Sequence, residues 1–143
     1  MLRGSLSHLD FTVSDLPASV RFYATLLPRL GYQRLDEFGG GAPCWGQRDG
    51  DGGYFSIALV EARSGGPTSH DRYTPGLHHA AFHVDSRTEV DEFHQFLIGI
   101  GATVLDPPAE YDYTPGYYAV FFADPDGLKL EVVFEPRLRG RTP

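Results

Sequence analysis

The chain carries the same succession of hydrophobic and polar positions twice. In both places, apolar residues first alternate with polar ones and then recur at intervals of three or four. Alternation is typical of a β-strand with one buried face, and the wider interval is typical of an amphipathic helix. A shift of 71 residues lays His8 on His79, Phe11 on Phe82, Val13 on Val84, Phe22 on Phe93 and Leu26 on Leu97. Each half of the chain is therefore predicted to open with a strand followed by a helix.

Residues suited to a helix N-terminus follow both predicted strands. Ser14 or Asp15 can cap the first helix, and Pro17 fits its first turn. Asp85 or Ser86 can cap the second. Their side-chain oxygens accept hydrogen bonds from backbone N–H groups that a helix leaves unpaired at its start. The two helices are therefore expected to begin directly after these residues.

Three short strand patterns follow each predicted helix. They cover residues 32–38, 43–48 and 54–61 in the first half and residues 102–105, 116–123 and 128–134 in the second. The sequence Asp-Pro-Asp-Gly at 124–127 predicts a tight hairpin between the last two strands. Each half therefore has the pattern β-α-β-β-β.

Two longer connections, at residues 62–76 and 106–115, interrupt this pattern. Both run into a Tyr-Thr-Pro-Gly tetrapeptide. Loops of this length beside strand ends are often lids or binding loops, and plain surface connection is the alternative. His70, in the first loop, is expected to be solvated.

Histidines occupy the polar faces of the two opening strands. In the stretch Leu-His-His-Ala-Ala-Phe-His-Val, strand alternation puts His79 and His83 on one face and His78 and Phe82 on the other. Because Phe82 is expected to pack against the helix, His79 lies on the polar face, as His8 does on the first strand. Across a pseudo-two-fold axis, His8 and His79 could converge on the inner surface of one curved sheet. His78 is expected at the surface or as a cap.

A carboxylate stands on the corresponding face of the last strand. In Leu-Lys-Leu-Glu-Val-Val-Phe, the alternate apolar residues form one face, and Lys129 and Glu131 form the other. A glutamate on a strand is ordinarily solvated. Two imidazoles and one carboxylate, however, form a recognised site for a catalytic divalent metal with open coordination positions. His8, His79 and Glu131 all occupy faces that permit such a site.

The composition limits the classes of function. The chain has 143 residues, 41% of them hydrophobic, and a formal net charge of −7. Its length fits one domain, and its acidity argues against binding to nucleic acid. The single cysteine, Cys44, excludes an internal disulfide, and no apolar run is long enough to span a membrane or to form a signal peptide. We therefore expect a cytoplasmic protein that binds neither nucleic acid nor membrane.

Three stretches, SHLDFTVSDLPASVRFY, LHHAAFHV and FFADPDGLKLEVV, resemble the vicinal oxygen chelate superfamily. This group includes glyoxalase I, extradiol dioxygenases, fosfomycin-resistance transferases and bleomycin-binding proteins. The resemblance covers nearly the whole chain and implies an α+β fold, in which paired βαβββ modules form a cupped, mostly antiparallel sheet around a metal site. The single domain, residues 1–143, would hold module one at about residues 5–62 and module two at about residues 76–135.

The same resemblance implies ligands and assembly. His8, His79 and Glu131 match the metal-ligand positions of the first, fifth and eighth strands. Glyoxalase I places a fourth ligand, usually a glutamate, on the fourth strand, where this chain reads YFSIALVEA. The apolar pattern puts Ala58 at that position, and Glu61 lies on the opposite strand face unless a bulge intervenes. Members of this size often pair modules across subunits, so a homodimer is expected.

Further residues of the polar face are candidates for a role beside the metal. The resemblance implies that the metal acts as a Lewis acid on two adjacent oxygens of a small substrate, and Fe, Mn, Zn, Ni or Co would each accept these ligands. His83 is the candidate acid–base residue, because an imidazole titrates near neutral pH. Tyr117 is a second candidate, with Tyr118 as the alternative if a bulge shifts the register. Asp10 and Thr12 share the polar face, and simple packing is the alternative for all of them.

Two classes of function remain. The first is a divalent-metal enzyme of the glyoxalase or dioxygenase type that acts on a small oxygen-rich substrate. The second is a metal-free protein that sequesters a drug, as bleomycin-resistance proteins do. The complete set of three ligands favours the enzyme, because a sequestering cup does not need them.

Overall fold

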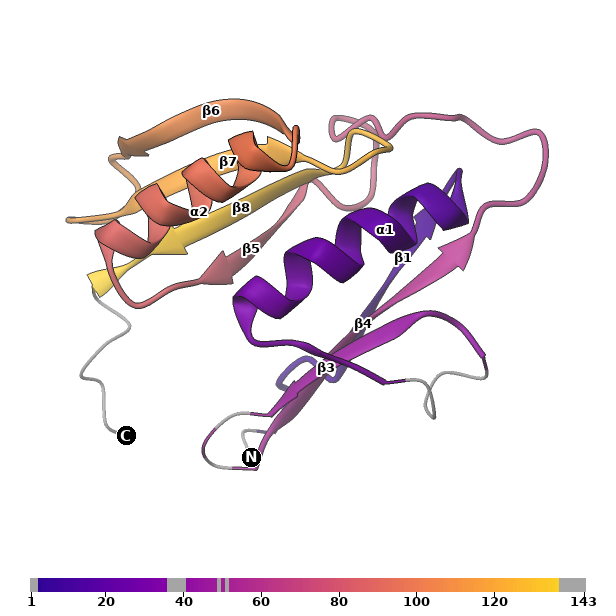
Figure 1. The fold of residues 1–143 in the computed structure, drawn as a ribbon, viewed down its shortest axis with the longest axis horizontal. Helices are drawn as coiled ribbons and strands as arrows, with labels where there is room; N and C mark the ends of the chain where they lie inside the picture. Colours follow the sequence, from indigo (N-terminus) through magenta and orange to yellow (C-terminus); the bar gives the residue numbers. More distant parts are fainter. Residues whose placement is uncertain (1–2, 36–40, 49, 51, 137–143) are drawn as a thin grey trace. The chain divides into compact units, whose positions relative to one another are not determined.

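The computed structural model describes residues 3–35, 41–48, 50 and 52–136. It divides the chain into two compact units, Met1–Thr68 and Ser69–Pro143. The first contains β1 (His8–Val13), α1 (Leu16–Leu26), the 3-10 helix η1 (Leu27–Leu30), β2 (Gln33–Arg34), β3 (Cys44–Arg48) and β4 (Tyr54–Glu61) (Figure 1). The second contains β5 (His79–His83), α2 (Arg87–Gly99), β6 (Thr103–Glu110), β7 (Tyr118–Ala123) and β8 (Lys129–Phe134). Each unit is thus a βαβββ module, and the predicted α+β class is confirmed.

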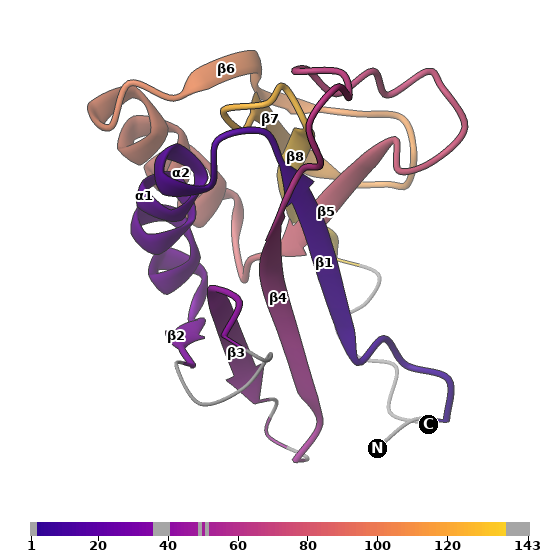
Figure 2. The same cartoon turned by 90° about the vertical axis from the view of Figure 1, so that its right-hand side faces the viewer.

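Both units have the same sheet topology. The strand order is β1-β4-β3-β2 in one sheet and β5-β8-β7-β6 in the other. β1 runs parallel to β4, as Figure 2 shows, and β5 runs parallel to β8, whereas the remaining pairs are antiparallel. The described strands pair only within their own unit. The 71-residue repeat is therefore a repeat of topology.

The helix starts agree with the predicted caps. The Asp15 carboxylate accepts a hydrogen bond from the Ala18 N–H at 2.9 Å. Ser86 caps α2 by accepting from the Glu89 N–H at 3.2 Å, and the Glu89 carboxylate accepts from the Asp85 N–H at 2.5 Å. Such reciprocal bonds satisfy backbone donors that the first helical turn leaves unpaired.

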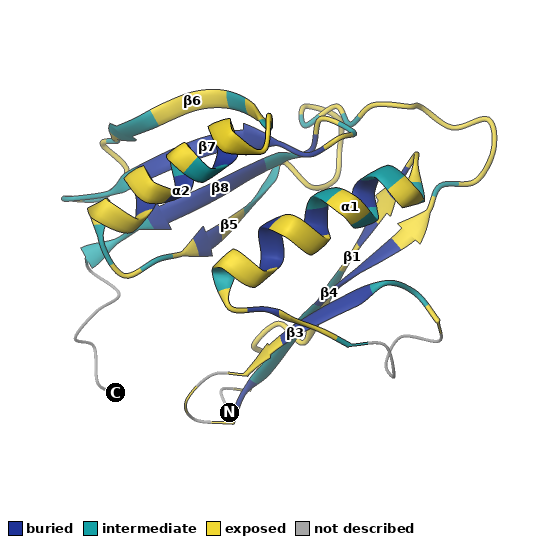
Figure 3. Cartoon of the chain, in the orientation of Figure 1, coloured by how far each residue is buried: buried dark blue, intermediate teal, exposed yellow. Residues whose placement is uncertain are grey.

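One side of each helix packs against its own sheet. The buried helix residues are Ser19, Tyr23 and Leu26 in α1 and Val90, Phe93 and Leu97 in α2. In Figure 3 the outer side of α2 is exposed, while β7 and β8 beneath it are buried. The 71-residue shift matches the outer two positions of each set, but Tyr23 is buried where Phe22 was expected. Phe22 instead lies half-buried with its ring edge-on to Tyr23.

Strand β6 overturns one prediction. Residues 106–115 were expected to form a loop, but β6 continues to Glu110. Its pairing with β7 shifts register between Val104 and Asp106 and again between Asp106 and Ala109. The two prolines at 107 and 108 lie in the second shift. Because β6 is an edge strand, its prolines need not donate to a second neighbour.

The predicted hairpin between β7 and β8 is confirmed, and it sets the register between these two strands. The Asp124 carboxylate accepts hydrogen bonds from the N–H groups of Asp126 and Leu128 at 2.9 and 2.8 Å. Gly127 has a φ of 81°, which a glycine adopts without strain. This turn places Phe121 directly opposite Glu131.

Two remaining expectations concern smaller features. Cys44 is buried and free of disulfide bonds. Of the predicted strand 32–38, the structure shows β2 at Gln33–Arg34, and residues 36–40 lie outside the described residues. None of the described helices has both the length and the apolar character needed to cross a membrane.

Candidate functional site

The centre of the candidate site is Glu131, in the middle of β8. A glutamate on a strand is ordinarily solvated, yet only 1% of the surface of Glu131 is exposed. Its Oε1 accepts a hydrogen bond from the Tyr117 hydroxyl at 2.5 Å, and its Oε2 lies 3.2 Å from Nε2 of His79. Burying a carboxylate without partners is costly. Tyr117 and His79 together supply the partners that allow Glu131 to stay inside the unit.

Strand register explains why these side chains meet. In the parallel pair β5–β8, His79 lies opposite Lys129, and Ala81 lies opposite Glu131. Paired residues point to the same side of a sheet, so all four share the face away from α2. Phe82, one residue further on, is buried on the helix side. The prediction that His79 shares a face with Glu131 is confirmed.

Tyr117 and Tyr118 point to opposite sides of the sheet. Burial, followed by the hydrogen bond to Glu131 and the charge of that carboxylate, raises the pKa of Tyr117. Tyr117 therefore stays protonated and acts as a hydrogen-bond donor. Tyr118 instead donates to Asp91 of α2 at 2.8 Å, and the Arg87 guanidinium lies 4.9 Å from its ring centre. The expected choice of Tyr117 as the inward tyrosine is confirmed, without a bulge.

His78 is exposed, as expected, but it is also the neighbour of His79. The two Nδ1 atoms are 2.7 Å apart, so one ring donates and the other accepts. His79 thus has both nitrogens engaged, Nδ1 toward His78 and Nε2 toward Glu131. Strand alternation did not anticipate this contact, because His78 precedes β5, where strict alternation no longer applies.

An aromatic cluster, Tyr111, Tyr113, Tyr117 and Phe121, adjoins Glu131 through the Tyr117 hydroxyl and through Phe121, which lies opposite Glu131 in the β7–β8 register. Tyr111 stacks on Tyr113 with ring centres 5.7 Å apart and meets Phe121 edge-on at 5.2 Å. Tyr113 also meets Tyr117 edge-on at 5.2 Å. Tyr111 and Tyr113 were not predicted as site residues, because residues 106–115 were expected to form a loop. Their spacing of two residues just after β6 was the available signal.

The remaining candidates of the polar faces are exposed. His83 ends β5 on the same face as His79, and no hydrogen bond links its side chain to the part of the chain that the structure describes. In the first unit, His8, Asp10 and Thr12 lie on one face of β1, as predicted, and that face is exposed. Nδ1 of His8 lies 3.3 Å from the Ser7 hydroxyl.

Ala58 occupies the position in the first unit that Glu131 occupies in the second. The β1–β4 register pairs Asp10 with Ala58, and the β5–β8 register pairs the equivalent Ala81 with Glu131. Glu61 lies opposite Val13, on the strand face opposite to that of Ala58, and is exposed. Ala58 is thus the equivalent of Glu131, as the apolar pattern of the two strands predicted.

The arrangement around Glu131 fits two ligands of a divalent ion. Imidazole nitrogen and carboxylate oxygen bind such ions at roughly 2.0–2.2 Å. Two atoms 3.2 Å apart, Nε2 of His79 and Oε2 of Glu131, are therefore spaced as adjacent ligands of one ion. The described residues contain no group of three or more His, Cys, Asp or Glu side chains that could hold a metal. Of the three predicted ligands, the structure brings together His79 and Glu131, while His8 belongs to the first unit.

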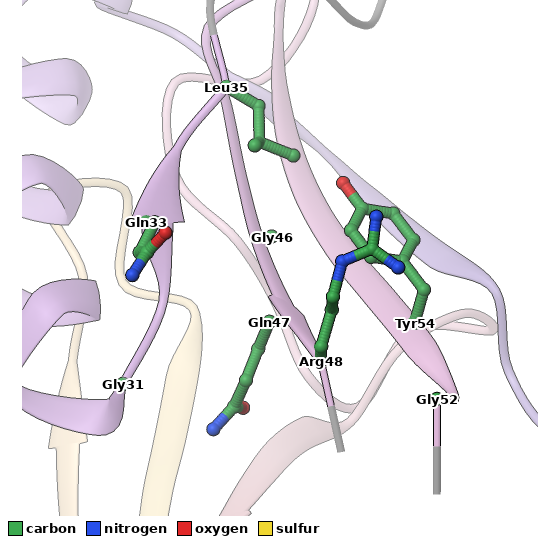
Figure 4. Close-up of a pocket in the computed structure, with 8 residues that line it drawn as sticks. All are labelled: Gly31, Gln33, Leu35, Gly46, Gln47, Arg48, Gly52 and Tyr54. Carbon is green, nitrogen blue, oxygen red and sulfur yellow. The ribbon is translucent and has the colours of Figure 1, made fainter. Parts of the chain in front are cut away.

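A separate cavity of about 600 Å³ lies within the first unit (Figure 4). Its lining residues include Gly31, Gln33, Leu35, Gly46, Gln47, Arg48, Gly52 and Tyr54. The Arg48 guanidinium lies 5.5 Å from the centre of the Tyr54 ring. None of the residues predicted for the site is among those lining it.

Comparison with known proteins identifies the family. Residues 5–132 match the model of the Glyoxalase/Bleomycin resistance protein/Dioxygenase superfamily. "Uncharacterized protein YqjT" of Bacillus subtilis (strain 168) is 36% identical over 134 residues, which are 90% of this chain and 97% of the relative. A glyoxylase/bleomycin resistance protein/dioxygenase domain from Frankia sp. EAN1pec is 27% identical, with a TM-score of 0.66 over 93% of this chain and 98% of that one. A glyoxalase/bleomycin resistance protein from Albidiferax ferrireducens T118 is 28% identical, with a TM-score of 0.64 over 91% and 98% of the two chains. The chain therefore belongs to the glyoxalase/bleomycin resistance protein/dioxygenase superfamily.

Proposed function

We propose that the protein is a divalent-metal enzyme that acts on a small, oxygen-rich substrate, with His8, His79 and Glu131 as its metal ligands. The buried contact between Glu131 and His79 carries this proposal. A binding cup for a neutral drug gains nothing from a carboxylate that must be desolvated and held by two partners. A metal enzyme needs both groups. The assignment of His8 rests on its match to His79 in the repeat and on the ligand positions of the superfamily.

The neighbouring residues would orient the two ligands. Tyr117 holds Oε1 of Glu131 and leaves Oε2 facing His79. When the proton of His79 is on Nδ1 and donated to His78, its Nε2 retains a lone pair for a ligand bond. Tyr117 and His78 are therefore positioning residues in this proposal.

His83 is the proposed acid–base residue. It lies on the polar face of β5, two strand positions from Ala81, and its exposed ring is free to exchange protons with solvent or substrate. A bound Fe, Mn, Zn, Ni or Co ion would supply Lewis acidity toward two adjacent substrate oxygens. The reaction is accordingly of the lyase, isomerase, dioxygenase or transferase type.

Metal content tests the ligand assignment directly. The wild type and the variants His8→Ala, His79→Ala and Glu131→Gln would be purified without chelator and measured by elemental analysis. We expect one divalent ion per chain in the wild type and its loss in each variant, because each removes a ligand bond. His94→Ala, on the half-buried side of α2, is the matched control and should retain the ion. Full occupancy in all three variants would refute the assignment.

The second candidate function is drug sequestration without metal. The observation that favours it is Tyr113, which is 67% exposed and stacked on Tyr111, so that it offers a flat ring to an aromatic ligand. A protein with no measurable affinity for any of the five metals, but with saturable bleomycin binding that Tyr113→Ala abolishes, would establish this alternative.

A further inference from the structure

A group of basic side chains adjoins the contact between His79 and Glu131 within the second unit. We call it the basic cluster: His70, Arg72, His78 and Lys129. Lys129, the only lysine of the chain, lies directly opposite His79 in the β5–β8 register. Its Nζ stands 3.9 Å from the centre of the Phe121 ring, which His79 also contacts edge-on. The ring holds the ammonium group in place by a cation–π interaction, without neutralising its charge.

The loop before β5 brings the other members close. The Arg72 guanidinium lies 5.0 Å from the centre of the Tyr73 ring, and that ring meets His78 edge-on at 5.7 Å. His78 in turn contacts His79. The loop is tied to the turn between β7 and β8, because the His70 N–H donates to the Asp126 carbonyl at 2.7 Å.

Arg72 and Lys129 carry the permanent positive charges of the basic cluster. Among the described residues, neither Arg72 nor Lys129 forms an ion pair. The Asp71 carboxylate accepts from the Tyr73 N–H, and Glu131 is already held by His79 and Tyr117. A chain of net charge −7 thus concentrates unpaired cations at one place.

Two polar atoms of the basic cluster also lack partners. Nδ1 of His70 and Nε of Arg72 are buried and make no hydrogen bond within the described part of the chain. His70 is therefore half-buried, not solvated as expected. A bound anion would accept hydrogen bonds from the unpaired donors and would also balance the charge of the unpaired cations.

We propose that Arg72, His78 and Lys129 form a subsite for an anionic oxygen group, a carboxylate or phosphate, of the substrate. Arg72 offers a planar fork of donors, and Lys129 offers a point charge fixed over Phe121. As a statement about the substrate, this inference rests on the proposed function, because it places the anion beside the proposed metal ligands. The binding of an anion is nevertheless measurable without metal.

The single lysine permits a direct test on the full chain. Reductive methylation with ¹³C-formaldehyde keeps the charge of Lys129 and gives it a methyl signal distinct from that of the N-terminus. The chelator-treated protein would be titrated with inorganic phosphate and, separately, with malonate. We expect a saturable shift of the Lys129 signal with at least one of the two anions and none of the N-terminal signal. Whether phosphate, malonate or both shift the Lys129 signal would identify the kind of anion that binds.

Variants then test the other members by calorimetric titration with the same anions. Arg72→Gln and Lys129→Met should each weaken binding about tenfold, as expected for the loss of a charge-assisted contact. Arg21→Gln, on the exposed side of α1, is the matched control and should bind like the wild type. An unresponsive Lys129 signal in the wild type, or unchanged affinity in both variants, would overturn the inference.

Metal analysis of the same preparations separates this inference from the proposed function. Metal bound without any anion binding would overturn the subsite and leave the metal enzyme standing. Anion binding in a protein that takes up no metal would support the subsite and reject the metal enzyme.

Discussion

At the scale of single residues, the state of Glu131 depends on the tyrosine that holds it. Tyr117→Phe removes one hydrogen bond but keeps the ring in its packing against the aromatic cluster. Because such outer partners typically contribute 10–100-fold to affinity, we expect metal affinity to fall by roughly that factor with stoichiometry retained. Metal titration with a competing chelator measures this change. Tyr118→Phe, which loses only its bond to Asp91, should leave the affinity unchanged, and an equal loss in both variants would contradict the positioning role.

His78 and His79 provide the second prediction at this scale. His79→Ala removes a direct ligand and should abolish stoichiometric metal. His78→Ala should keep one ion per chain while lowering affinity by about tenfold, since it removes only the partner of Nδ1. Metal content and affinity of the two variants decide the matter. If His78→Ala empties the site and His79→Ala does not, the assignment of the ligand is wrong by one residue.

Sequence alone predicted which residues share a face but not which are buried. Alternation was sufficient to separate His79 from His78 and Tyr117 from Tyr118. It could not show that Glu131 is buried, because burial depends on the strands and loops around it. For the same reason the partial burial of His70 was missed: its loop has no periodicity, and its position depends on a hydrogen bond to a distant turn.

At the scale of secondary-structure elements, the predictable boundaries were the helix starts and the turn that short-range side-chain hydrogen bonds fix. Asp15, Ser86 and the turn at 124–127 make their bonds within a few residues, so their signals are present in the sequence. Strand β6 was predicted too short, and the residues left out of it include Pro107 and Pro108. Their tolerance at a sheet edge follows from strand order, which the local pattern does not contain.

The strands of the first unit give a prediction about packing. A Cβ at Gly46 of β3 would meet Cδ1 of Leu35 at 2.5 Å and would clash with the Tyr54 hydroxyl. Gly46→Ala should therefore lower the free energy of unfolding by about 1–3 kcal/mol, the usual cost of overpacking. Urea denaturation measures the loss. Gly99→Ala, at the end of α2 with open space around it, should be neutral or slightly stabilising, and equal effects of the two changes would contradict the close approach at β3.

At the scale of the whole molecule, one topology carries two different inner faces. The repeat gives both units the same strand order, so a position in one has a defined equivalent in the other. At the equivalent positions Ala58 and Glu131, the first unit has a methyl group and the second has a carboxylate. The fold was therefore predictable from the repeat. The functional side chains had to be assigned residue by residue, because the shared periodicity does not distinguish an alanine from a glutamate at equivalent positions.

Edge strands motivate the last prediction, that the protein is a homodimer in solution. Each sheet ends in strands that have a neighbour on only one side, β1 and β2 in the first unit and β5 and β6 in the second. Open edges of this kind are commonly covered by another chain, and closed two-fold dimers are the commonest solution. Sedimentation equilibrium at micromolar concentration should give twice the mass of 15.8 kDa, in both metal-loaded and chelator-treated protein. A stable monomer that still binds one metal ion per chain would reject the dimer while leaving the assignment of the ligands intact.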